Sequence, residues 1–423
     1  MISKIFNFLK IIHKRSLEEK KYSFENNDIF NSLNPFFTAF LYRRISKIKI
    51  ENDIKNTFDI NGDILFFSSA RMSLNFILSN LKAKNREYVV VQAFTCGVVI
   101  NAIIRAGFRP LYVDIDKNNL GTSFEDFRNL YKTYNTSIRA VIVQHSFGIP
   151  ASINKFVEFS REKNIFVIED CATSLGSKLN EKTCGNFGDA AFWSFDPTKP
   201  FSIGTGGVLS INNTNLFNNL KTIYLELPTQ TNKEFFFFSV RYLTRQLAHK
   251  LIVYSYPRKL FIELSETFLS KFLSFSGYSE DWNYSNKYPK NYSYPSKLNP
   301  LFIYSLHRSL KYFKKIQRNK INLFELIKKK YYSNLNLAFK NRLDCELIPS
   351  RILLNKEDNS YIEKYVNQNK AWFREPLQGI DPNTGDQSIR YKKGIAPLSE
   401  NLTMKTYSIP MNNKFFLKLI SRN

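Results

Sequence analysis

The sequence is poor in the residues that bind metals and form disulfides. Its 423 residues include only four histidines and four cysteines, namely Cys96, Cys171, Cys184 and Cys345. The cysteines form no C-x-x-C pair, and the histidines are scattered along the chain. We therefore expect no zinc site and no disulfide framework, and a reduced, cytoplasmic setting.

The sequence also lacks a long apolar run. No stretch reaches the roughly 18–20 residues that a membrane-spanning helix needs. Residues 1–24 place apolar side chains at helical spacing among lysines, but Lys10 interrupts the run and no cleavage site follows, so this is not a secretory signal. Such a basic amphipathic helix either packs its apolar stripe on the rest of the protein, as most amphipathic helices do, or lies on a membrane surface.

Acidic residues are outnumbered, and the formal net charge is +25. A strong positive balance favours phosphate-bearing ligands, nucleic acid or an anionic membrane face. The lysines are spread along the whole chain, however, as a Lys- and Asn-rich composition alone would produce. No P-loop or RNA-binding signature is present, so we expect no nucleic-acid partner.

What is present is a regular alternation of apolar runs and helical patterns. Strands are expected at Ile64–Ser68, Tyr88–Gln92, Leu111–Ile115, Ala140–Gln144 and Phe166–Glu169. Helices are expected between them, at Met72–Leu81, Val98–Ala106, Phe124–Tyr134 and Ile153–Lys163. This order predicts an α/β fold with a mostly parallel sheet covered by helices on both faces.

Changes in residue composition and hydrophobic pattern along the chain predict four parts. These are an N-terminal helical segment (1–60), a large α/β domain (61–225), an aromatic and basic helical insertion with a linker (226–295) and a smaller C-terminal α+β domain (296–423). Residues 235–275 are rich in aromatic and basic side chains, which favours either a buried interdomain helix or a surface for lipid headgroups. In the last part we expect a helix over Leu301–Lys330, strands at Leu343–Ile348 and Thr406–Ile409, and a final helix near Asn413–Ile420.

The residues that carry chemistry lie just after strands of the large domain. Asp170 ends an apolar strand, Ser194 closes another apolar run, and Lys199 follows five residues later. The turn Ser69-Ala70-Arg71 joins the first strand to a helix, where free backbone N–H groups favour a phosphate. A carboxylate, an amine and a phosphate-binding turn are the groups that hold pyridoxal 5'-phosphate (PLP), with the acid on the ring nitrogen and the amine on the aldehyde carbon.

The motifs of this region resemble those of the DegT–DnrJ–StrS family of sugar aminotransferases, over a stretch running from about Ile64 to the C-terminus. The segments that carry the resemblance are His145–Gly148, Glu169–Gly176, Gly185–Asp189, Ser194–Lys199, Pro397–Glu400 and Ile409-Pro410. They resemble the family's H-x-x-G, E-D-A-A-x-x-x-G, G-x-x-G-D, S-F-x-x-x-K, P-x-A-E and L-P elements. A lysine at the end of S-F-x-x-x-K also argues against the family's dehydratase branch, which has histidine there.

The resemblance implies a fold type I PLP enzyme that works as a homodimer. Lys199 would form the Schiff base, Asp170 would pair with the ring nitrogen, and Ser194 would bind the phosphate. The enzyme would transfer an amino group, with glutamate as the donor, to a nucleotide-linked keto sugar for surface polysaccharide or glycan synthesis.

Five residues in four motifs depart from the family pattern. Ser69-Ala70-Arg71 replaces S-G-T, and the guanidinium group of Arg71 could donate two further hydrogen bonds to the phosphate. Cys96 stands where an aromatic ring usually covers the cofactor, and Thr173 stands where Gln or His usually reaches the phenolic oxygen. Thr205 replaces the glutamate of E-G-G.

Two alternatives to the aminotransferase remain open. The departures at Thr173 and Thr205 are also compatible with a PLP enzyme of another reaction type on the same scaffold. The high positive charge and the aromatic insertion are compatible with a non-catalytic protein that binds a membrane surface, at the inner face of the membrane, on that scaffold.

Overall fold

The computed structural model describes residues 45–81, 83–251, 294–340, 344–355 and 391–411, with short pieces between 261 and 269. The helices predicted for residues 1–24 and near Asn413–Ile420 lie outside the described residues. Most of the linker before residue 294 lies outside them as well. Among the helices that the structure does describe, none is both long and apolar enough to cross a membrane.

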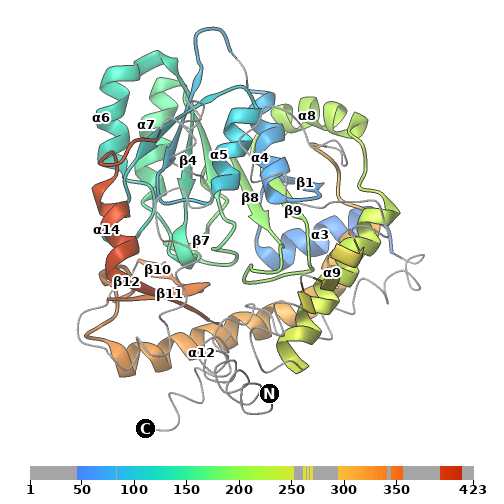
Figure 1. The fold of residues 1–423 in the computed structure, drawn as a ribbon. Coiled ribbons are helices and arrows are strands. Elements are labelled where there is room, and N and C mark those ends of the chain that lie inside the picture. Colours follow the sequence, from blue (N-terminus) through green and yellow to red (C-terminus); the bar gives the residue numbers. More distant parts are fainter. Residues whose placement is uncertain are drawn as a thin grey trace, which may run out of the picture.

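A seven-stranded sheet forms the centre of the molecule (Figure 1). Its strands are β1 (Asp63–Phe67), β2 (Tyr88–Gln92), β3 (Arg109–Val113), β4 (Ile138–Gln144), β5 (Phe166–Asp170), β8 (Ala190–Ser194) and β9 (Gly207–Ile211). Their order across the sheet is β1-β9-β8-β5-β4-β2-β3. Only β9 runs against its neighbours among these seven, so the expected mostly parallel sheet is confirmed.

Helices cover both faces of this sheet because its strands are apolar on both sides. In β2, Val89 and Val91 pack with α4 (Ala70–Ser79), α5 (Gly97–Arg105) and α8 (Thr214–Glu226). Val90 points the other way and packs with α6 (Phe124–Tyr134) and α7 (Ile153–Lys163). The three valines are 0% exposed, which explains why this strand reads as a continuous apolar run rather than an alternating one.

The expected elements of the large domain are found, with small shifts at their ends. The bounds of β2, α6 and α7 are those predicted from the sequence. The third strand begins and ends two residues earlier than predicted, because Arg109 already pairs with Tyr88 and Ile115 instead pairs with Thr122 of the following loop. Short 3-10 turns complete this part of the chain, at Asn135–Ser137 and Ser146–Gly148.

A second apolar cluster lies beside the β1–β9–β8 side of the sheet. It joins α3 (Lys47–Phe58), α9 (Asn232–Leu251) and α11 (Pro300–Ser309) to the sheet side chains. The single helix expected over Leu301–Lys330 is instead divided. A 3-10 turn at Leu310–Tyr312 separates α11 from α12 (Phe313–Tyr331), which runs along the base of the molecule in Figure 1.

The C-terminal part contributes two small sheets. In the first, β10 (Cys345–Glu346) pairs with β6 (Lys178–Leu179), which also pairs with β7 (Lys182–Thr183). In the second, β11 (Arg351–Asn355) pairs with β12 (Thr406–Pro410), and a 3-10 turn lies nearby at Leu337–Phe339. The strand predicted at Thr406–Ile409 is thus confirmed, whereas the one predicted at Leu343–Ile348 is shorter.

Helix α14 (Pro397–Lys405) is held to the large sheet by one carboxylate. Asp114 follows β3, and its Oδ2 accepts the amide of Leu398 at 2.7 Å. Its Oδ1 accepts both the amide and the hydroxyl of Ser399, at 2.8 and 2.6 Å. Both amides belong to the first turn of α14, whose N–H groups have no acceptor within the helix. Asp114 therefore caps α14, although it lies 285 residues before Ser399 in the chain.

Replacing Asp114 with alanine should therefore loosen α14. The substitution leaves first-turn amides without an acceptor, and we expect a loss of about 1–3 kcal/mol in the free energy of unfolding, measured by denaturant titration. Asp116→Ala is the matched control, because that nearby side chain bonds only within its own loop. Equal losses in the two variants would contradict the capping role.

Candidate functional site

The predicted site residues gather at the carboxyl edge of the large sheet. Asp170 is the last residue of β5, Ser194 is the last residue of β8, and Ser69 follows the end of β1 by two residues. Lys199 lies in the turn after β8, where its amide donates to the carbonyl of Asp196 at 3.0 Å. Ligands of parallel sheets bind at this edge, because strands end and helices begin there.

Asp170 is a buried carboxylate within electrostatic reach of Lys199. Its side chain accepts the amide of Ala172 at 2.9 Å, and the residue is only 5% exposed. Burial raises the pKa of Asp170, while the Ala172 amide and the charges of Lys199 and His145 oppose that rise. The charge of Lys199 thus acts on the Asp170 carboxylate, and the predicted roles of the two residues toward a shared cofactor stay predictions.

The turn at Ser69 has the features of a phosphate cradle. Ser69 is the N-cap of α4, yet its side chain makes no capping bond, and its buried Oγ has no hydrogen-bond partner. Gly207 lies against this turn so closely that a Cβ there would be 2.4 Å from the amide nitrogen of Ala70. An unpartnered hydroxyl beside the N-terminus of a helix fits the phosphate of PLP.

Ser194 and Arg71 both contact Asp196, a residue of the loop after β8. The Ser194 Oγ accepts the amide of Asp196 at 3.5 Å, and Ser194 is 6% exposed. Arg71 Nη2 lies 3.4 Å from Asp196 Oδ2, and both side chains are largely buried. The guanidinium thus reaches the loop that leads to Lys199, and its predicted contact with the phosphate stays a prediction.

Cys96 and Thr173 lie on neighbouring loops. Cys96 is the half-buried N-cap of α5, and its thiol makes no capping bond. The Thr173 hydroxyl donates to the carbonyl of His145 at 3.0 Å, which ties the loop after β5 to the end of β4. Their predicted contacts with the cofactor ring and its phenolic oxygen stay predictions.

A buried cluster beside Asp170 was not expected from the sequence. His145, Glu169 and Cys171 bring ligand-type atoms within 4.8 Å of one another. Their lone pairs are already used, however: Glu169 accepts the amides of Gly185, Phe187 and Gly188 at 2.7 Å each and lies 3.0 Å from His145 Nε2.

His145 Nδ1 in turn accepts the amide of Ala151 at 3.0 Å, so its Nε2 carries the hydrogen that faces Glu169. With these acceptors occupied, we assign the cluster to positioning rather than to metal binding. It fixes the loop 185–188 and the end of β5, and so holds the backbone on which Asp170 stands. The only sequence signal for it was the spacing of the H-x-x-G, E-D and G-x-x-G-D elements.

The comparisons with known proteins agree with this geometry. Residues 50–236 match the DegT/DnrJ/EryC1/StrS aminotransferase family. GDP-perosamine synthase of Escherichia coli O157:H7 is 31% identical over 151 residues, which are 36% of this chain and 41% of that protein. The dTDP-4-dehydro-2,3,6-trideoxy-D-glucose 4-aminotransferase of Saccharopolyspora spinosa is 30% identical over 145 residues, 34% of this chain and 37% of that one. The chain thus aligns with about two fifths of the length of these curated relatives.

Solved structures extend the likeness in fold to most of the chain. A DegT DnrJ EryC1 StrS aminotransferase from Brucella abortus has a TM-score of 0.66 at 16% identity, covering 93% of this chain and 94% of that one. The PLP form of a Streptococcus pneumoniae protein described as a sugar aminotransferase has a TM-score of 0.61 at 15% identity, covering 88% of each. At such low identity the likeness shows the fold alone, which confirms the expected PLP-transferase architecture.

The raised pKa of Asp170 predicts a pH-dependent cost in the cofactor-free protein. An acid whose pKa is higher in the folded state stabilises folding less as pH rises from its unfolded pKa of about 4 through the folded value. Asp170→Asn removes this cost while keeping an acceptor for Ala172. We expect the stability difference, variant minus parent, to increase with pH in denaturant titrations between pH 4 and 8. A difference that is independent of pH would contradict the burial of a charged carboxylate.

Proposed function

We propose that this protein is a PLP-dependent aminotransferase of nucleotide-linked keto sugars, because residues 50–236 match the DegT/DnrJ/EryC1/StrS aminotransferase family. The single observation that carries the proposal is the buried carboxylate of Asp170 at the carboxyl edge of the sheet, where the charge of Lys199 acts on it. The names of the two curated relatives, one a GDP-sugar synthase and one a dTDP-sugar aminotransferase, support the substrate class.

The residues of the site divide the work of holding PLP. Lys199 Nζ would hold the aldehyde carbon, Asp170 would face the ring nitrogen, and the Ser69 turn with Ser194 would bind the phosphate. When bound, PLP supplies an electron sink for the pair released when a proton leaves the adjacent carbon. Burial matters here, because a carboxylate in a dry site keeps a neighbouring ring nitrogen protonated more effectively than one in water.

Lys199 has a second role in transfer. With its amine freed from the cofactor, Nζ would move a proton from the donor's α-carbon to the cofactor's C4′ carbon, and in the second half-reaction it would move one from C4′ to the sugar carbon that is aminated. Glutamate as donor is part of the proposal and rests on the family resemblance. A positively charged chain also suits a substrate that carries a diphosphate.

An absorbance experiment with glutamate tests the reaction type. The PLP-loaded protein should lose its visible band on addition of glutamate, as the amino group passes to the cofactor, and then aminate a keto-sugar nucleotide. Lys199→Ala should lower the rate by at least about 100-fold, because proton transfer by a positioned base contributes at least that much. Lys182→Ala, at an exposed position in β7, is the control and should leave the rate unchanged.

Retention of the rate by Lys199→Ala would contradict the proposed base. A wild-type protein whose visible band is unchanged by glutamate, but changes with another amino acid, would favour a different donor. Loss of carbon dioxide from that amino acid would identify the other reaction type on this scaffold.

The proposal includes a homodimer working in the cytoplasm, with peripheral membrane contact through the aromatic insertion. The dimer rests on the resemblance, and the membrane contact rests on exposed apolar side chains. Phe236, Leu264 and Phe268 are 44%, 60% and 71% exposed in the described part of the insertion. We expect a mass of twice 49.6 kDa by light scattering and co-flotation with anionic liposomes. A monomeric mass would contradict the proposed dimer. Protein that stays at the bottom of the flotation gradient at low salt would contradict the proposed membrane contact.

A further inference from the structure

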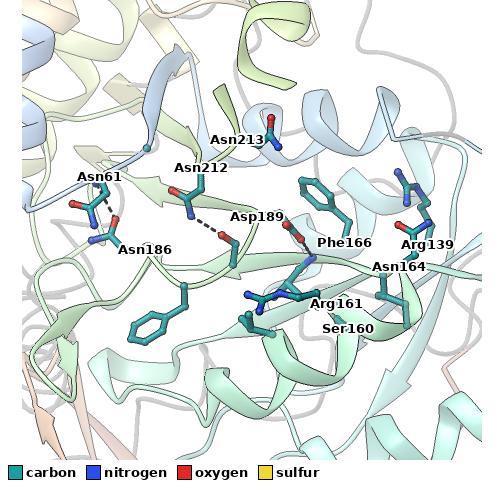
Figure 2. Close-up of a pocket in the computed structure, with 16 residues that line it drawn as sticks. Asn61, Arg139, Ser160, Arg161, Asn164, Phe166, Asn186, Asp189, Asn212 and Asn213 are labelled. Atoms are coloured by element: carbon teal, nitrogen blue, oxygen red, sulfur yellow. Dashed lines mark hydrogen bonds between the residues drawn. The ribbon is translucent and has the colours of Figure 1, made fainter. Parts of the chain in front are cut away.

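A pocket opens at the amino edge of the sheet, opposite the proposed active site. Its volume is about 660 Å³, within the roughly 300–1,000 Å³ of typical ligand pockets. Figure 2 shows the side chains that line it, which come from the starts of β4 and β5, the end of α7 and the turns before β8 and after β9.

The thickness of the sheet separates the two sites. Phe166 lines the pocket at the first residue of β5, whereas Asp170 is the last residue of that strand. Asp189 lines it just before β8, whereas Ser194 ends β8. Five strand residues span about 13–17 Å, so one small ligand cannot occupy both sites.

The pocket carries an excess of positive charge. Arg139 and Arg161 both line it and both act on the single carboxylate of Asp189. Arg86 lies next to them: its guanidinium donates to the carbonyls of Ile138 and Asn164, and together with burial it lowers the pKa of Arg139. Neighbouring half-buried guanidiniums repel one another, and a bound anion would relieve that repulsion.

Neutral polar groups complete the lining. Ser160 is one of the lining residues, and its Oγ is fully buried behind the wall and has no hydrogen-bond partner. Asn61 and Asn164 line it with exposed side chains, and amides can both donate to and accept from a ligand hydroxyl. Phe166 and Phe187, both half-buried, add apolar ring surface to an otherwise polar wall.

We propose that this pocket binds a phosphorylated sugar, with its phosphate between Arg139 and Arg161 and its hydroxyl groups on the exposed amides of Asn61 and Asn164. Guanidinium groups match phosphate oxygens in pairs, and amides can donate to and accept from sugar hydroxyl groups. The proposal concerns a site remote from Lys199 and does not depend on the reaction proposed there. The pocket therefore offers the protein a place to sense a phosphorylated sugar without competing with its substrate.

Calorimetric titration of the full-length, PLP-treated protein with glucose 1-phosphate tests this site. Arg161→Glu should weaken binding at least about tenfold, because it replaces a phosphate ligand by a like charge. Lys163→Glu is the matched control: it reverses the same charge in the same last turn of α7, but Lys163 does not line the pocket. Both residues are exposed, so neither change removes core packing.

Two further titrations test which part of the ligand is recognised and whether the binding is independent of Lys199. Methyl glucoside and inorganic phosphate should each bind more weakly than glucose 1-phosphate, and Lys199→Ala should leave glucose 1-phosphate binding unchanged. Equal weakening by Arg161→Glu and Lys163→Glu, equally tight binding of phosphate alone, or no binding at millimolar concentration would each overturn the proposal. Loss of amination in Lys199→Ala with retained binding would separate this pocket from the reaction at the other edge.

Discussion

The burial of one carboxylate beside one amine is the constraint on which the proposed chemistry depends. Asp170 stands at the end of an apolar strand where its charge is costly, and the Ala172 amide, Lys199 and His145 offset that cost only in part. A protein that needed only stability would place a neutral residue there. A positively charged partner would offset the remaining cost of this burial, and the protonated cofactor ring of the proposed function is such a partner.

The backbone that carries Asp170 is held by a saturated network. Glu169 points to the opposite side of β5 and accepts three loop amides as well as facing His145. Glu169 and Asp170 are adjacent but have separate roles, because successive side chains of a strand face opposite sides. One carboxylate fixes the structure, and the other is left available for chemistry.

The sequence predicted those features that depend on local pattern. The bounds of β2, α6 and α7 follow from apolar runs and periodicity, and the apolar runs placed Asp170 and Ser194 at strand ends and Lys199 just after the second of these strands. The break between α11 and α12 was missed, because residues 310–312 contain neither Gly nor Pro to signal it.

Features that depend on distant pairing could not be predicted in this way. Asp114 caps a helix from 285 positions away, and the pairing of Arg71 with Asp196 joins residues 125 apart. The pocket at the amino edge of the sheet is a further example, since Arg139, Arg161 and Asp189 share no motif or spacing. They meet only because parallel strands begin at a common edge, and this becomes apparent only once the strand order is known.

Borohydride reduction of the PLP-treated protein, followed by digestion and mass spectrometry, tests the central claim most directly. Reduction fixes the cofactor irreversibly to the amine that holds it, and a lysine-rich chain supplies many competing amines as internal controls. The account predicts that the pyridoxyl group is found on Lys199 and is lost in Lys199→Ala. A label spread over surface lysines, or concentrated on a different one, would contradict it.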